Sequence, residues 1–149
     1  MKRYQLLNFY NCISQIDLQV VDKESRTILL NLDILIGDMA EAHEEEVDKI
    51  RKRLVRGHED EIRRVEELMY RLQEAEDKSA IKAKIDASVT YHEIHQQLEE
   101  EINRRMMEDV DIIIEDKVTS EQLAQWCADS GISMTLNLLR EYKRAGLIS

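Results

Sequence analysis

The sequence predicts a mainly α-helical fold, in which a long antiparallel, coiled-coil-like helical hairpin carries short helices at both ends of the chain. The 149 residues include no proline and only four glycines, where average usage would give about 7 prolines and about 10 glycines. Apolar residues recur at steps of three and four over most of the chain, the spacing of a helix face that packs on a neighbour. We therefore expect long helices within a single domain, residues 1–149.

The N-terminal stretch predicts a short helix followed by an extended segment. Residues 4–15 place apolar side chains at helical spacing, whereas apolar and polar residues alternate in "IDLQVVD", residues 16–22. Three consecutive isoleucines in "EDVDIIIEDK" favour a second extended segment at 110–116. Because a lone strand cannot satisfy its backbone, we expect a minor two-stranded β element that pairs about 16–22 with 110–116.

The predicted hairpin occupies residues 23–109. One apolar stripe runs from Ile28 to Leu72 and a second, of similar length, runs from Ile81 to Val110, so burying one against the other is the economical packing. Gly57 is the only residue that indicates a break in the first stripe. A continuous helix and a kink or turn at Gly57 are both open.

The C-terminal residues 118–149 predict two short helices. Thr119 or Ser120 is placed to cap the first, and Gly146 to end the second. The stretch "SGISMTLNLLREYKRAGLIS" has the outline of a helix-turn-helix, but its first helix is nearly one turn too long and its second begins without cations. The cationic rim formed by Arg140, Lys143 and Arg144 comes only later. Packing is favoured over DNA recognition, and the net charge of −10 opposes a nucleic-acid partner.

Two patterns have the residue types and spacing of metal or catalytic sites. His92, His95 and Glu99 share one helix face, and Glu108 with Asp111 has a spacing seen in all-helical, magnesium-dependent nucleotide hydrolases. The partners of Glu108 and Asp111 would be the glutamates at 41, 44 and 45. A chain with 31 acidic residues produces such spacings by chance. We expect solvated helix faces, with no metal, no cofactor and no enzymatic activity.

The segment "ILLNLDILIG" carries more apolar residues than one helix face can hold. Apolar side chains occupy positions 28, 29, 30, 32, 34, 35 and 36, so the helix must be covered on several sides. Either the N-terminal and C-terminal helices pack over it within one chain, or another subunit does. In both cases the belt is a candidate interaction surface, and we expect a protein partner, with homo-oligomers favoured. Its named residues are Ile28, Leu29, Leu32, Leu35 and Ile36.

The expected location is the cytoplasm. The longest apolar run is about half of what crosses a bilayer, and the first residues are too polar for a secretory signal. Cys12 and Cys127 are far apart in the sequence, and reduced thiols are the default.

Some of these segments resemble small helical proteins encoded among the tail and morphogenesis genes of tailed phages and prophages. The similar segments are "LLNLDILIGDMAEAHEEEVDKIRKRL", "MMEDVDIIIEDKVTSEQL" and "MTLNLLREYKRAGLI", whereas residues 57–90 depart from the pattern. The resemblance implies a non-enzymatic structural or interaction role in assembly. A DNA-binding regulator and a metal-dependent nucleotide hydrolase are the alternatives.

Overall fold

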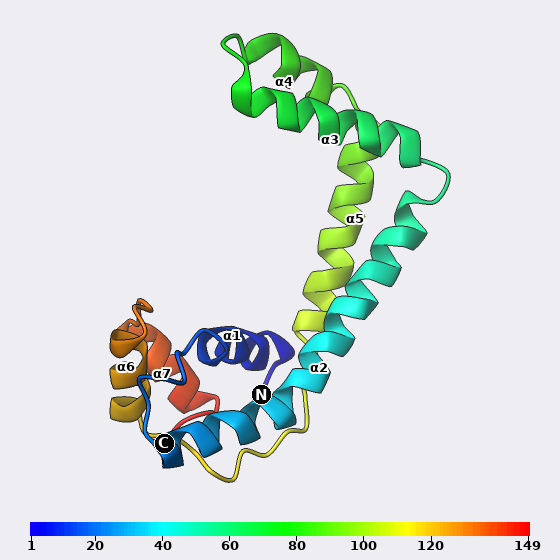
Figure 1. Cartoon of the computed structure of the whole chain (residues 1–149). Helices are drawn as coiled ribbons and strands as arrows, with labels where there is room; N and C mark the ends of the chain where they lie inside the picture. Colours follow the sequence, from blue (N-terminus) through cyan, green and yellow to red (C-terminus); the bar gives the residue numbers. More distant parts are fainter. The chain divides into compact units, whose positions relative to one another are not determined.

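The computed structural model describes residues 1–149 and consists of seven helices without a strand (Figure 1). The helical class is thus confirmed. The chain divides into two compact units: unit 1 comprises Met1–Glu44 with Arg105–Ser149, and unit 2 comprises Glu45–Arg104. The helices are α1 (Arg3–Ile13), α2 (Lys23–Val55), α3 (Glu59–Glu74), α4 (Ser79–Asp86), α5 (Val89–Met106), α6 (Ser120–Asp129) and α7 (Leu136–Arg144).

Unit 1 is built around a core that joins both ends of the chain. Helix α1, the first half of α2, the extended segment 107–118 and the pair α6–α7 all contribute buried apolar side chains. Phe9 is fully buried and meets the ring of Tyr142 edge-on at 5.3 Å between centroids. The core residues are Leu6, Phe9, Cys12, Ile13, Ile16, Val21, Leu29, Leu32, Ile36, Ile114, Val118, Leu123, Trp126, Cys127, Tyr142, Leu147 and Ile148.

The predicted β pairing of 16–22 with 110–116 is wrong. Residues 16–22 form turns, because the carboxylates of Asp17 and Asp22 accept hydrogen bonds from the backbone N–H groups of Gln19 and Ser25, at 2.9 and 2.7 Å. The second of these bonds caps the start of α2. Alternating apolar residues in this stretch therefore mark a capped turn, since such aspartate side chains offer the backbone an alternative to a strand.

The start of the chain, rather than residues 16–22, meets the second predicted strand. Lys2 and Asp109 form an isolated antiparallel bridge. The N–H of Arg3 donates to the carbonyl of Glu108, and the N–H of Val110 donates to the carbonyl of Met1, at 2.9 and 3.0 Å. These few bonds tie the first residues to segment 107–118 without forming a ladder.

The C-terminal helices begin and end at the predicted caps. The hydroxyl of Thr119 accepts from the N–H of Gln122, whose side chain accepts in turn from the N–H of Thr119, which completes a capping box. Gly146 follows α7 with a φ of +79°, the left-handed conformation that glycine adopts without strain. Sequence capping rules therefore located this segment correctly.

Unit 2 contains the rest of α2 together with α3, α4 and α5. Gly57 has a φ of +83° and lies in the turn between α2 and α3, so the first predicted stripe is two helices rather than one. The guanidinium of Arg53 donates to the carboxylate of Glu101, and the hydroxyl of Ser88 donates to Glu61 at 2.9 Å. Coiled-coil packing of the predicted hairpin stays a prediction.

Replacing Phe9 by alanine should lower the free energy of unfolding of unit 1 by about 3–5 kcal/mol, because the change leaves a cavity in a closed core. The single tryptophan, Trp126, lies in the same core, so its fluorescence during urea titration reports this unfolding. Leu136→Ala is the control. Its side chain is 80% exposed, and we expect a change within about 0.5 kcal/mol. Equal effects of the two substitutions would contradict the assigned core.

Candidate interaction surface

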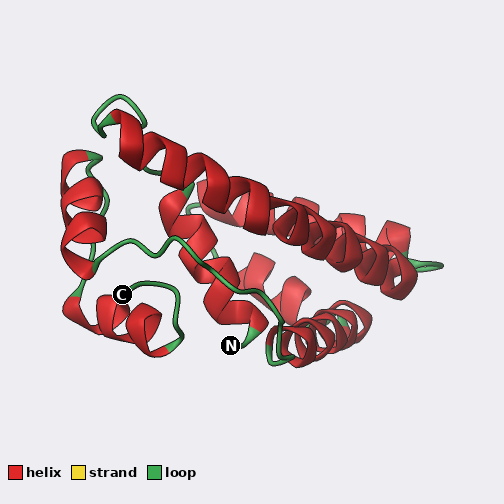
Figure 2. Cartoon of the chain, turned by 90° about the horizontal axis from the view of Figure 1, so that it is seen from below, coloured by secondary structure: helices red, strands yellow, loops and turns green.

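The outer face of α2 in unit 1 exposes large aliphatic side chains. Leu29, Leu32 and Ile36 point into the core, at 5%, 3% and 0% exposure, whereas Leu30 and Ile34 are 52% and 73% exposed. Figure 2 shows α1 and the α6–α7 pair on one side of α2, and no other segment of unit 1 on the opposite side. One helix thus buries one apolar stripe and presents a second to solvent.

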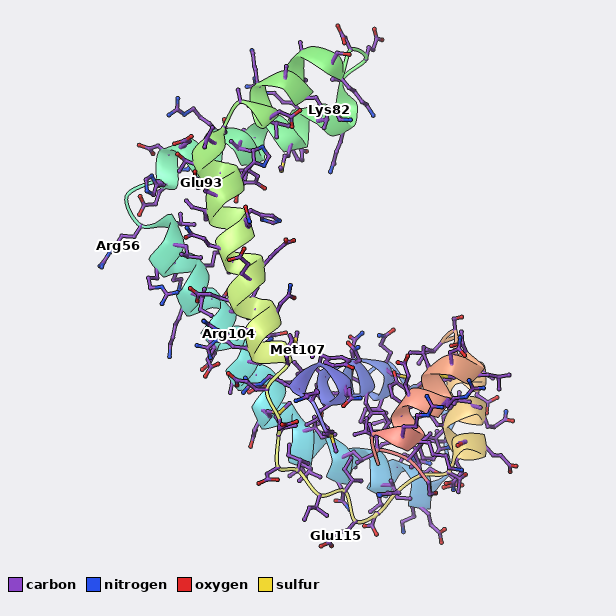
Figure 3. All side chains as sticks on the ribbon, turned by 180° about the vertical axis from the view of Figure 1, so that it is seen from behind. Arg56, Lys82, Glu93, Arg104, Met107 and Glu115 are labelled. Atoms are coloured by element: carbon purple, nitrogen blue, oxygen red, sulfur yellow. The ribbon has the colours of Figure 1, made fainter.

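A groove flanks this outer face. Segment 107–118 runs beside α2, with Ile114 buried and the neighbouring Ile113 81% exposed. The groove has a volume of about 370 Å³. Glu115, at its rim, points away from the ribbon (Figure 3). The groove is lined by Ile28, Asn31, Leu32, Ile34, Leu35, Ile113, Ile114, Glu115 and Asp116.

The structure separates the five predicted surface residues into two groups. Leu29, Leu32 and Ile36 are buried in the core of their own chain, together with side chains of α1, α6 and α7, which is the first of the two kinds of cover that the sequence left open. Ile28 is half-buried and Leu35 is 42% exposed, and both line the groove.

Sequence reasoning missed the three most exposed members of this surface, Leu30, Ile34 and Ile113. The spacing of Leu30 and Ile34, four residues apart, was the available signal, since it forms a second stripe on the far face of the helix. No signal pointed to Ile113, because its exposure depends on how segment 107–118 lies against α2.

The cationic rim lies on α7. Arg140, Lys143 and Arg144 are exposed, and no ion pair joins them to a carboxylate of the chain. The first turn of α7 instead presents Leu136, at 80% exposure, and Asn137. A groove-reading helix presents several cations or amides there, whereas this turn offers one amide and no cation, so DNA binding stays an alternative that this geometry does little to favour.

The two groups of side chains with metal-ligand spacing are held by other contacts. No group of three or more His, Cys, Asp or Glu side chains is placed to hold a metal ion. The carboxylate of Glu108 accepts from the guanidinium of Arg3 at 2.9 Å. His92 Nε2 lies 3.1 Å from the carbonyl of Ile85, and the ring of His95 stacks on Tyr91 at 5.9 Å. Glu108, His92 and His95 therefore each have a neighbouring group within the chain.

Unit 2 has a cavity of about 680 Å³ between the end of α2, α3 and α5. Aliphatic side chains of Val55, Ile62, Ile94 and Leu98 line it beside charged ones of both signs. Arg56 is part of the lining, yet its side chain points away from α5 (Figure 3).

The two cysteines, 115 positions apart, meet in the core of unit 1. Their Sγ atoms are 3.7 Å apart and both thiols are free. Burial, followed by the neighbouring thiol of Cys127, raises the pKa of Cys12 to about 12. Burial likewise raises the pKa of Cys127. Because the thiolate is the reactive form, both side chains act as apolar core residues at neutral pH.

Comparison with known proteins adds no relative. No protein-family model, no curated protein and no solved structure matches the chain. None of the helices is both long enough and apolar enough to cross a lipid bilayer.

Alkaline pH should destabilise unit 1. The pKa of Cys12 rises from 9.0 to about 12. The pKa of Tyr142, through burial, and that of Tyr10, through its hydrogen bond to Asp33, rise from 10.0 to about 12. A raised pKa means that the folded state holds the proton more tightly, so this stability is complete below pH 9 and is lost as the pH rises toward 12.

The measurement is urea unfolding followed by Trp126 fluorescence at pH 7.5 and at several values above pH 9. Each group that is protonated only in the folded state lowers the free energy of unfolding by about 1.4 kcal/mol per pH unit. Cys12→Ala removes one such group, so its stability should fall less steeply. Equal slopes for this variant and the parent chain would exclude Cys12 as a contributor.

Proposed function

We propose that this chain is a non-enzymatic structural protein that associates with further copies of itself through the outer face of α2. The observation that carries the proposal is the exposure of Ile34 and Ile113, at 73% and 81%, on either side of one groove. Contiguous apolar surface of this kind on a charged protein marks a contact site more often than a free surface.

The free energy gained by covering this surface is comparable with the cost of association. Fully burying one Leu or Ile side chain stabilises by roughly 1.5–3 kcal/mol. Four large apolar side chains are each between 42% and 81% exposed: Leu30, Ile34, Leu35 and Ile113. A contact between two copies would cover these four side chains in each copy, eight in all. That gain is of the same order as the cost of association, roughly 4–15 kcal/mol. A reversible oligomer is the expected outcome.

An assembly role also accords with the sequence resemblance to phage tail and morphogenesis proteins. We extend the proposal to that setting, with the cytoplasm of a bacterial host as the place of action.

Sedimentation velocity and light scattering across a dilution series test the proposal. The parent chain should show at least twice the mass of one chain at high concentration and dissociate on dilution. Placing carboxylates on the surface with Ile34→Asp and Ile113→Asp together should give a monomer with an unchanged helical circular dichroism spectrum, because charged groups resist burial without a partner.

Leu136→Asp is the matched control, since Leu136 is also 80% exposed but lies on α7, outside the groove. This variant should associate like the parent chain. A parent chain that keeps the mass of a monomer at every concentration would refute self-association.

A further inference from the structure

Six residues of α2 form one straight stripe along its outer face. Successive members are separated by four, three, four, four and three positions, which returns each to nearly the same side of an α-helix. All six are exposed, and all belong to unit 1. In order, they are Lys23, Thr27, Leu30, Ile34, Asp38 and Glu41.

The stripe has an apolar centre and ends of different charge. Leu30 and Ile34 lie in the middle, with a lysine at the N-terminal end and two carboxylates at the C-terminal end. No ion pair within the chain involves Lys23, Asp38 or Glu41. The charges of the stripe are therefore available to a neighbouring molecule.

We infer that the α2 helices of two copies pack antiparallel, related by a two-fold axis that passes between Leu30 and Ile34. This inference rests on the proposed self-association and specifies its geometry. The axis lies at the level of residue 32, so Leu30 of each copy meets Ile34 of the other. The same register places Lys23 opposite Glu41, and Thr27 close to Asp38.

The sides of the helix agree with this register. The two-fold axis is perpendicular to the plane that contains the two helices, so a given residue lies on the same side of this plane in both copies. Two residues can therefore meet across the contact only if they lie on the same side of their own helix. At about 100° per residue, Lys23 and Glu41 both lie about 20° to the same side of Ile34. Their side chains can therefore meet across the axis, and the contact is isologous and closes as a dimer.

A parallel arrangement would be unfavourable. It would set Lys23 beside Lys23, Asp38 beside Asp38 and Glu41 beside Glu41, and like charges face to face oppose association. The groove beside the stripe, lined by Leu35 and Ile113 among others, offers a recess for side chains of the second copy.

Charge exchange between the ends of the stripe tests the register. Lys23→Glu alone and Glu41→Lys alone should each raise the dimer dissociation constant about tenfold, because each reverses both symmetry-related pairs. The chain with both substitutions should regain the parent dissociation constant. An equal mixture of the two single variants should form a heterodimer in preference to either homodimer.

Recovery of the dissociation constant in the double variant cannot come from an ion pair between residues 23 and 41 of the same chain. Eighteen positions separate residues 23 and 41, which is about 27 Å along a helix. Lys49→Glu, a change of the same size at an exposed lysine of α2 outside the stripe, is the control and should leave the dissociation constant within about twofold.

The outcomes separate the two proposals. Loss in both single variants, with recovery in the double variant and in the mixture, supports the antiparallel register. A dimer that is indifferent to these changes, or a double variant as weak as the single ones, overturns the register and leaves self-association standing. A monomeric parent chain overturns both.

Discussion

The burial of the inner face of α2 is the interaction on which unit 1 depends. Leu29, Leu32 and Ile36 are almost wholly removed from water, and together they contribute several kcal/mol at roughly 1.5–3 kcal/mol each. Helix α1 and the C-terminal segments supply the opposing side chains. Since these partners come from both ends of the sequence, the core cannot form until the chain has returned from residue 105 onward.

The same dependence explains how the chain ends are held. Ser149 donates its N–H to the carbonyl of Val118, and Ser120 donates its N–H to the carbonyl of Ser149, at 2.9 and 3.3 Å. Leu147 and Ile148 just before them are buried. Cys12 and Cys127 meet in the same core. Residues that the sequence separates widely thus become neighbours because they share the face of one helix.

The helices could be predicted from sequence patterns that are local along the chain. Three- and four-residue spacing, the Thr119 capping box and Gly146 each concern residues within a turn or two of one another, and such interactions are specified by the nearby sequence. The β element failed because the partner of an extended segment is a tertiary choice. The carboxylates of Asp17 and Asp22 accept hydrogen bonds from nearby backbone N–H groups. Lys2, rather than a residue of 16–22, forms the antiparallel bridge with Asp109.

The interaction surface could be predicted only in part for a related reason. An excess of apolar residues in 28–36 indicates that more than one side of the helix requires cover, but not which side the chain itself covers. That choice depends on where α1 and segment 107–118 pack. Their packing assigned Leu29, Leu32 and Ile36 to the core and left Leu30 and Ile34 outside. The proposed contact would cover the two side chains that the chain's own packing leaves exposed.

Charge then decides direction rather than strength in the proposed contact. Each copy carries a net charge of −10, so two copies repel at long range, although physiological salt screens charges more than about 8 Å apart. Exposed ion pairs such as Lys23 with Glu41 contribute roughly 0–1 kcal/mol, less than one buried isoleucine. The apolar side chains at the centre of the stripe supply the attraction. Because Lys23 lies at one end of the stripe and Asp38 and Glu41 at the other, only the antiparallel arrangement avoids placing like charges opposite each other.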